Sequence, residues 1–299
     1  MEQEISFYSD GRKLVGVLFE PDGSDANNYP GVVLCQGMSG LKEAYRFPEI
    51  ARRFVALGCV ALIFDYNSIG ESEGDPGRFY PMEQVEDIRS ALTFLELHPK
   101  VDDRRLALYG MSFGGGTVPY VAAIDSRVKC TISSVGFGDG ERFIRNFRPT
   151  WDWLNFKERL AKDRQTQVQT GKSERVAGRD ILLPDPNSHG EEAAVRKNIP
   201  HMENFQLSDF SLASIERILE FQPLYIVDRI SPRAILFITA EKDTSTAADD
   251  VEDMYRRAKE PKKLLCIPGI NHYDVYRDVY FEQIMEATTG WLKQHLPIK

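Results

Sequence analysis

The fold of this chain is decided by the stretch Arg105-Leu106-Ala107-Leu108-Tyr109-Gly110-Met111-Ser112-Phe113-Gly114. Its first half is typical of a short buried strand, and the apolar residues 117–123 that follow predict a buried helix. A serine at so sharp a turn from strand to helix is held exposed, with its hydroxyl free to attack a carbonyl carbon. Glycines are needed beside it because a side chain there would collide with the neighbouring strand or helix. We therefore expect Ser112 to be a nucleophile, the alternative being an ordinary glycine-rich turn.

Apolar strand candidates and amphipathic helices alternate on both sides of this stretch. Helical spacing of apolar residues predicts helices at about 47–57 and 82–97, and a turn at 9–12 predicts an N-terminal hairpin. Near-continuous apolar strands between such helices indicate an α/β fold with a mostly parallel sheet covered on both faces. The strands expected lie at residues 5–8, 14–18, 31–35, 59–64, 105–109, 128–133, 234–238 and 263–267.

The alternation stops at about residue 139 and resumes near residue 233. We therefore predict a core in two parts, 1–138 and 233–299, with an insertion at 139–232 that forms a mainly helical cap. Helices are expected in it around 142–164 and 212–221, flanking a polar segment at 165–188 that should be mobile. Most of its aromatic side chains are expected to form a small core of its own, and a subset to face the site as a lid: Phe143, Phe147, Trp151, Trp153, Phe156, Phe205, Phe210 and Phe221.

Bulk composition restricts the class of protein. The 299 residues are 42% hydrophobic and 27% charged, as in ordinary globular proteins, and a formal net charge of -8 argues against binding to nucleic acid. Residues 1–6 show no secretory pattern and no apolar run approaches the roughly 20 residues that span a bilayer, so we expect no membrane association and a cytoplasmic location. Buried free thiols, rather than disulfides or metal ligands, are expected at Cys35, Cys59, Cys130 and Cys266.

A serine hydroxyl needs a base within hydrogen-bond reach, and the base needs a carboxylate to orient it. Of five histidines only His272 follows a strand candidate through a short loop, which brings it to the same edge of a parallel sheet as Ser112. Asp243 also follows a strand, so the chain order is serine, aspartate, histidine. Competing candidates for the acid are Glu241, which we expect to pair with Lys242 or solvent, and the pair Asp249-Asp250, which we expect on a solvated helix face.

Attack on a carbonyl places negative charge on its oxygen, which two aimed N–H groups must stabilise. One donor should be the amide of Phe113, at the start of the helix after the serine. The loop 36–40 after the first buried strand should supply the other, and we expect it to be the amide of Met38. A glycine turn that only reverses the chain is the alternative for this loop.

These features together resemble the α/β-hydrolase superfamily, and most closely its esterase and dienelactone-hydrolase-like branches. The resemblance rests on the Gln36-Gly37 loop, residues 65–74, residues 110–114, Asp243 and His272-Tyr273-Asp274. It implies an eight-stranded, mostly parallel sheet with a cap inserted after the sixth strand. Two positions depart from the family pattern: Gln36 stands where many relatives carry histidine, and Asn67-Ser68 where arginine and glycine are common.

We expect a serine hydrolase of small carboxylic esters or lactones that works through an acyl-enzyme on Ser112 and takes a small-molecule substrate. Acyl transfer, carbon–carbon bond hydrolysis and peptide hydrolysis use the same triad and stay open, as does a non-catalytic ligand receptor on the same fold. No cofactor and no metal are expected, and a homo-oligomer stays open. Tyr45 and Trp151 are the expected substrate contacts.

Overall fold

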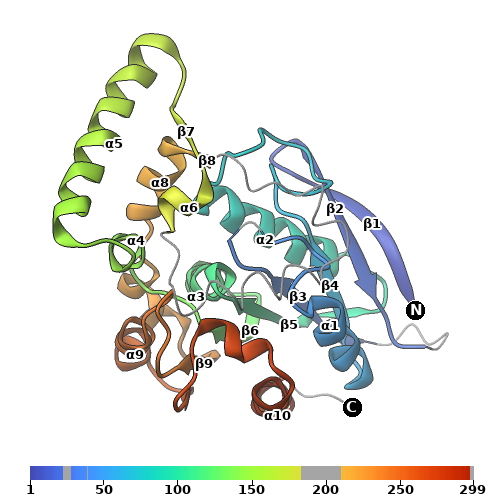
Figure 1. Ribbon diagram of the computed structural model, residues 1–299. Coiled ribbons are helices and arrows are strands. Elements are labelled where there is room, and N and C mark those ends of the chain that lie inside the picture. The colour runs from blue at the N-terminus through green and yellow to red at the C-terminus, as the bar shows by residue number, and fades with distance from the viewer. Residues whose placement is uncertain (23–27, 39, 183–209, 297–299) are drawn as a thin grey trace.

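Eight strands form one sheet in the order β1-β2-β4-β3-β5-β6-β9-β10 (Figure 1). The computed structural model describes residues 1–22, 28–38, 40–182 and 210–296. β1 and β2 form the expected antiparallel hairpin, β2 also runs antiparallel to β4, and the other neighbours are parallel. The strands are β1 (Glu2–Ser9), β2 (Arg12–Phe19), β3 (Tyr29–Cys35), β4 (Val60–Phe64), β5 (Val101–Met111), β6 (Val128–Ser134), β9 (Ala234–Ala240) and β10 (Lys262–Ile267).

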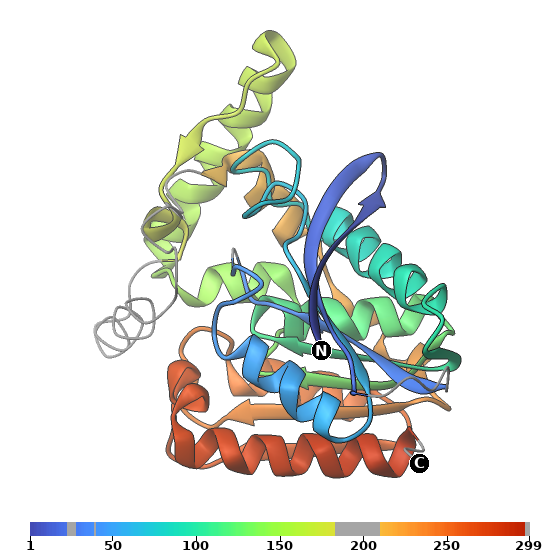
Figure 2. The same cartoon turned by 90° about the vertical axis from the view of Figure 1, so that its right-hand side faces the viewer.

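Helices cover both faces of this sheet because its central strands are apolar on both sides. α1 (Phe47–Ala56) and α10 (Asp278–His295) lie on one face, and α2 (Pro81–Glu96), α3 (Phe113–Ile124) and α9 (Ala248–Arg257) on the other (Figures 1 and 2). In β3, Val33 packs under α2 and α3, while Val32 packs under α1 and α10. Each such residue contributes about 1.5–3 kcal/mol when fully buried. The α/β fold with a mostly parallel sheet is thus confirmed.

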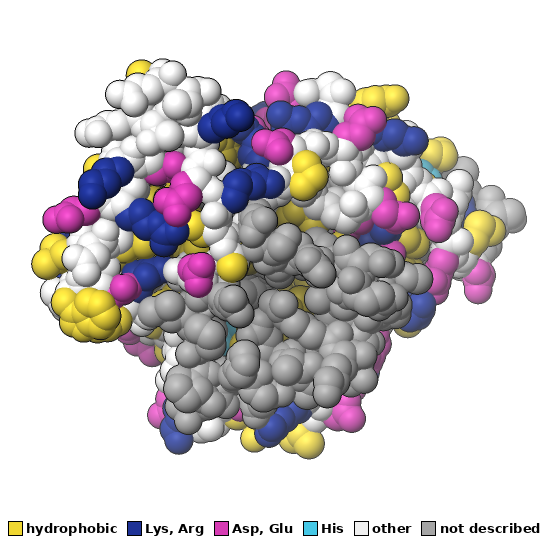
Figure 3. Space-filling model, turned by 45° about the horizontal axis from the view of Figure 1, so that its top comes forward, with side chains coloured by type: hydrophobic (Ala, Val, Ile, Leu, Met, Phe, Trp, Pro, Cys, Tyr) yellow, Lys and Arg dark blue, Asp and Glu magenta, His cyan; other side chains and the backbone are white. Residues whose placement is uncertain are grey.

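The segment between β6 and β9 contains short elements around one long helix that extends away from the sheet (Figures 1 and 2). On the surface around it, basic and acidic side chains are interspersed (Figure 3). Its elements are α4 (Gly140–Asn146), α5 (Thr150–Thr170), β7 (Arg175–Val176), α6 (Gly178–Ile181), β8 (Phe210–Ser211), α8 (Leu212–Leu219), η1 (Pro223–Tyr225) and η2 (Val227–Ile230).

Two expectations for this segment were wrong. The single helix expected at 142–164 is two helices, because Pro149 has no N–H to continue α4 and directly precedes α5. The polar segment expected from residue 165 begins later, since α5 continues to Thr170 and ends at Gly171 with φ 73°. Residues 183–188 of that segment, together with Phe205, lie outside the described residues.

The cysteines are free thiols, and three of the four are buried as expected. Cys266 is exposed, which corrects the expectation for that residue. Cys266 lies on β10, which is at one edge of the described sheet and pairs with β9. Among the described residues, no helix is both long and apolar enough to cross a membrane.

Candidate active site

Ser112 lies at the turn between β5 and α3 with φ 57° and ψ -120°, a strained conformation for a residue with a side chain. Its amide donates to the Ser134 carbonyl oxygen at 2.9 Å. Neighbouring backbone approaches so closely that glycine is required on both sides: an added Cβ would lie 2.2 Å from the Gly114 oxygen at Gly110, and 2.0 Å from the Cys35 oxygen at Gly114. The glycine pattern of the sequence therefore has the steric cause expected of it.

The structure brings Ser112, His272 and Asp243 into one hydrogen-bonded row. His272 Nε2 lies 3.0 Å from Ser112 Oγ, and His272 Nδ1 lies 2.7 Å from Asp243 Oδ2. The side chains of His272 and Asp243 are buried, whereas Ser112 is half-buried. With Nδ1 donating to the carboxylate, Nε2 is left as the acceptor for the serine proton.

Asp243 is held by the turn that follows β9. Its Oδ1 accepts hydrogen bonds from the amides of Ser245 and Thr246, at 2.8 and 2.7 Å. The Thr246 hydroxyl lies 2.8 Å from the Val135 carbonyl oxygen and 3.0 Å from Asp243 Oδ2. The sequence analysis did not single out Thr246, although an aspartate that caps the amides two and three residues later is a recognisable turn signal.

The competing carboxylates have partners elsewhere. Glu241 is exposed and accepts a hydrogen bond from the Gly269 amide at 2.6 Å. Asp250 was expected on a solvated helix face, but it is buried and accepts from the amide of Gly138 at 2.9 Å. Burial raises its pKa to about 6. Asp250 is stable inside the protein because it also accepts from the Asp139 amide and from the guanidinium of Arg142, each at 3.3 Å.

The loop after β3 lies directly against the serine. A Cβ added to Gly37 would come within 3.0 Å of Ser112 Cβ and 3.4 Å of Ser112 Oγ. Met38 follows in this loop, and Phe113 begins α3 on the other side of the serine. Phe113 is thus the residue directly after the nucleophile, and Met38 directly follows the glycine that packs against it. Their role as oxyanion donors stays a prediction.

Buried polar side chains join this loop to the end of β4. Gln36 Nε2 donates to the Phe64 carbonyl oxygen at 2.5 Å. Asp65 accepts the Lys42 amide at 2.8 Å and the Lys42 ammonium at 3.1 Å, and Glu71 also accepts from that ammonium. Although burial alone lowers the pKa of Lys42, these carboxylates raise it above its usual value, so the lysine stays charged. Charge-assisted hydrogen bonds thus hold the segment after β3 against the segment after β4.

The departures from the family pattern at residues 67 and 68 have a structural counterpart. Asn67 donates to the Asp87 carboxylate of α2 from its amide at 2.9 Å and from Nδ2 at 2.6 Å. Ser68 adopts φ 67°, a conformation that favours glycine. The loop 65–74 is therefore anchored to α2 through an amide side chain.

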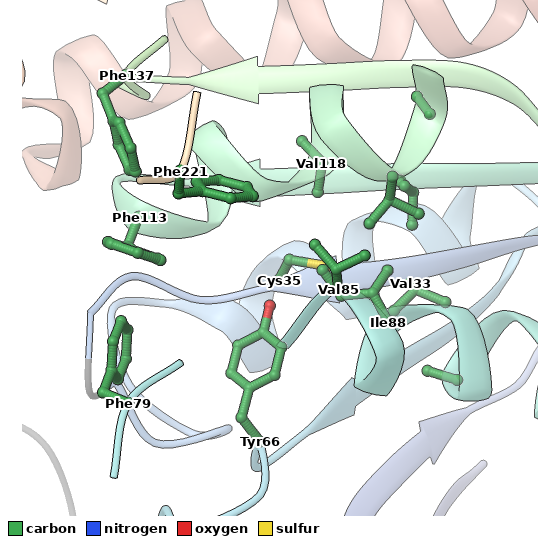
Figure 4. Packing of buried hydrophobic residues seen from close by; sticks show 14 of the residues in the cluster. Val33, Cys35, Tyr66, Phe79, Val85, Ile88, Phe113, Val118, Phe137 and Phe221 are labelled. Atoms are coloured by element: carbon green, nitrogen blue, oxygen red, sulfur yellow. The ribbon is translucent and has the colours of Figure 1, made fainter. Parts of the chain in front are cut away.

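An aromatic cluster joins the insertion to the turn that carries Ser112. The Phe113 ring lies between Phe79 and Phe137, at centroid distances of 4.7 and 5.0 Å (Figure 4). Phe143 of α4 stacks on Phe137 at 4.7 Å, and Phe221 contacts the same ring at 6.2 Å. These insertion aromatics pack against the sheet domain. Trp153 and Phe156 on α5, whose ring centroids are 6.2 Å apart, belong to the same buried cluster, so the separate core expected for the insertion is not formed.

The expected substrate contacts lie in different surroundings. Tyr45 is half-buried and packs its ring on Tyr276 at 5.1 Å. Trp151 is 68% exposed in the first turn of α5. Contact of either residue with substrate stays a prediction. Within the described residues, no group of three or more potential ligands could hold a metal ion.

Comparison with known proteins agrees with this arrangement. The sequence profile of the dienelactone hydrolase family matches residues 14–198, which is more than half of the chain. The chain belongs to the dienelactone hydrolase family. As a member of that family with this fold, it is an enzyme of the hydrolase class.

Relatives align along most of their length. An uncharacterised 31.7 kDa protein from the traX-finO intergenic region of Escherichia coli is 29% identical over 90% of this chain and 92% of that protein. A thiohydrolase of Eupenicillium brefeldianum is 28% identical over 97% and 94%, and the polyketide transferase grgF of Penicillium sp is 27% identical over 96% and 94%. The crystal structure of the alpha/beta hydrolase GrgF from Penicillium sp. sh18 aligns with a TM-score of 0.79 at 26% identity, over 99% of both chains.

Proposed function

We propose that the protein is a serine hydrolase that cleaves a small carboxylic ester or lactone through an acyl-enzyme on Ser112. The observation that carries this proposal is the row of two hydrogen bonds, 3.0 and 2.7 Å long, from Ser112 through His272 to Asp243. A serine activated by a base that is itself oriented by a carboxylate is the arrangement that acyl transfer requires.

The proposed reaction has two halves. As Ser112 Oγ bonds to the carbonyl carbon, its proton passes to His272 Nε2, and the amides of Phe113 and Met38 stabilise the resulting oxyanion. Collapse of this intermediate breaks the bond to the leaving alcohol, which takes the proton from His272. Water then attacks the acyl-enzyme and gives a proton to His272. The bond between the acyl carbon and Ser112 Oγ breaks, Oγ takes that proton from His272, and the acid is released.

The strained backbone at Ser112 supports the proposal. A non-glycine residue at φ 57° is costly and is found where the rest of the fold enforces it, as at the serine turns of hydrolases. We also propose that residues 139–232 act as a cap, because two of its aromatic side chains contact the body next to this turn: Phe143 of α4 and Phe221 both pack on Phe137.

A single-turnover experiment tests the serine role. Mixing the enzyme with para-nitrophenyl acetate should give a burst of nitrophenol equal to the enzyme concentration, with an acetyl group on the peptide that contains Ser112. Ser112→Ala should abolish the burst and lower kcat by about a millionfold, as expected when the nucleophile of such a triad is removed. Absence of the burst together with failure of a fluorophosphonate to label Ser112 in the wild type would contradict the proposal.

Acyl transfer to an alcohol or amine is the second candidate. It is favoured by the likeness to grgF, a protein named a polyketide transferase, along 96% of this chain. Product analysis separates the two functions: with a thioester or ester donor and an added alcohol, a transferase gives mainly the new ester, whereas a hydrolase gives mainly the free acid.

A further inference from the structure

The proposed base lies on an element that is too short to hold itself in place. His272 is the first residue of η3 (His272–Tyr276), a single turn of 3-10 helix. Such a turn has few internal hydrogen bonds and depends on contacts outside it. Its beginning is held by Asn271, whose side chain accepts from the Tyr273 amide at 3.2 Å and whose own amide donates to Asp274 at 3.0 Å. At its end the Arg277 amide donates to the Asp274 carbonyl oxygen at 2.9 Å, and α10 begins at Asp278.

Arg46 holds that end, although it is 230 residues away in the sequence. Its Nη1 donates to the Tyr276 carbonyl oxygen at 3.1 Å and to Asp278 Oδ1 at 2.8 Å. The rest of the guanidinium makes a two-point contact with Glu49, at 2.7 and 3.0 Å, and its carbon lies 3.7 Å from the centroid of the Phe281 ring. These contacts together are possible in only one orientation of the planar guanidinium.

The backbone that presents Arg46 is strained. Tyr45 and Arg46 both adopt left-handed conformations, with φ 52° and 64°. Two consecutive residues with side chains in this region are unfavourable and are kept there only by their surroundings. The contacts of Arg46 and the packing of Tyr45 on Tyr276 are such surroundings.

Aromatic rings continue the connection to the base. From Tyr45 the row passes to Tyr276 at 5.1 Å, to Tyr273 at 6.4 Å and to His272 at 5.2 Å. Tyr45 and Arg46 belong to the same connection, between β3 and α1, that carries Met38. One segment therefore approaches the serine at Gly37 and supports the histidine element at its other end.

We propose that Arg46 is a positioning residue that fixes η3 and thereby keeps His272 Nε2 within hydrogen-bond reach of Ser112. The inference rests on the proposed function, since it needs His272 to act as the base. Removing the guanidinium should let residues 45–46 relax and the histidine ring shift. A displacement of about 1 Å in a catalytic group lowers the rate on the order of 100-fold.

The test compares Arg46→Met with a matched control, Arg53→Met. Arg53 also binds Glu49, at 3.0 Å, and lies over the Phe281 ring at 5.2 Å, while its partners Glu49 and Glu282 lie on α1 and α10 rather than on η3. With para-nitrophenyl acetate, Arg46→Met should lower kcat on the order of 10- to 100-fold with KM unchanged, and Arg53→Met should leave both close to the wild type. The rate of Ser112 labelling by a fluorophosphonate should fall by the same factor as kcat.

A double-mutant cycle distinguishes positioning of the base from general damage. In a His272→Ala background, Arg46→Met should cause no further loss of labelling rate, because the group it positions is gone. An equal loss in both backgrounds, or an effect no larger than that of Arg53→Met, overturns the inference. If Arg46→Met does not fold by circular dichroism, Arg46→Lys replaces it, and the same dependence on His272 is required.

Failure of the two proposals can be distinguished. If wild-type Ser112 is not labelled at all, the proposed function fails and the inference fails with it. If the wild type is labelled and His272→Ala slows labelling, the function stands, and only the comparison of the Arg46 and Arg53 variants decides the inference.

Discussion

The sheet domain and the insertion use different means to hold their parts in place. In the sheet domain, the proposed catalytic residues follow the ends of parallel strands: Ser112 after β5, Asp243 after β9 and His272 after β10. Backbone hydrogen bonds between neighbouring strands fix their register, and parallel strands end at the same edge of the sheet. The three loops that follow these strands therefore lie close together at that edge. The described part of the insertion contains none of these three residues and contributes no strand to this sheet. It contacts the sheet domain through side chains and through single backbone hydrogen bonds, such as that from the Ser211 amide to the Gly77 carbonyl oxygen at 3.0 Å.

Two of the contacts between the insertion and the sheet domain involve buried side chains. Phe143 stacks on Phe137 beside the serine turn, and Asp250 of α9 binds the chain at Gly138 and Asp139. The proposed catalytic residues and the residues that hold the insertion to the sheet domain are therefore separate sets. Substitutions of the proposed catalytic residues should therefore change activity at little cost in stability, and substitutions in these contacts should do the reverse.

After removal of the nucleophile itself, the largest effect on activity is expected for Asp243→Asn. An amide in place of the carboxylate no longer favours the histidine form that accepts the serine proton, so kcat should fall by about 10,000-fold while the melting temperature changes little. Initial rates with para-nitrophenyl acetate measure this. Glu241→Gln is the matched control, since Glu241 is exposed and bonds to Gly269 instead, and it should retain activity. Equal losses in both variants would contradict the assignment of the acid.

A large effect on stability is expected for Phe143→Ala. Phe143 is 4% exposed, and truncating a buried phenylalanine lowers the free energy of unfolding by about 3–5 kcal/mol. Urea unfolding measures this, with the half-buried Phe147 as control: Phe147→Ala should cost less. Under native conditions the rate of Ser112 labelling should remain within about threefold of the wild type, a factor equivalent to less than 1 kcal/mol. A loss of labelling larger than the loss for Asp243→Asn would contradict the separation of catalytic residues from those that hold the insertion.

The smallest effect is a pH dependence at Asp250. Burial raises the pKa of this carboxyl from 3.8 to about 6, so the folded state binds its proton more tightly than the unfolded state does. Its contribution to stability is fully present below about pH 4 and is lost as the pH rises through 6, a change of up to about 3 kcal/mol.

Asp250→Asn removes this titration while keeping an oxygen acceptor for the two amides. The difference in unfolding free energy between wild type and variant should therefore shift against the wild type from about pH 4 to about pH 7, measured by urea unfolding. Asp253→Asn serves as control because Asp253 pairs with the same Arg142 but is more exposed, and it should leave this shift unchanged. A constant difference across the range would show that Asp250 does not titrate there.

Much of the fold and the proposed triad could be predicted from the sequence because their signals are local. Apolar periodicity identifies strands and helices, and the glycine pattern at 110 and 114 is a recognisable signal of the turn, although Gly110 is required by contact within the turn and Gly114 by contact with Cys35 at the end of β3. His272 and Asp243 could be selected because each follows a strand, and strand direction alone places them at the edge that carries Ser112.

Other features could not be predicted because they depend on which side chains meet in space. Nothing near Arg46 in the sequence indicates that it binds Tyr276, and nothing near Asp250 indicates that it is buried. The break between α4 and α5, by contrast, has a local signal in the sequence, because Pro149 has no N–H to continue a helix.

Residue spacing and backbone sterics are sufficient to predict the strand and helix pattern, the nucleophile turn and the order of the proposed triad. Only the tertiary structure decided which residues support the base, which carboxylate anchors the insertion and how Lys42 remains charged inside the protein. The reason is physical. A buried polar group is stable only with its partner, and that partner is fixed by the packing of segments far apart in the chain.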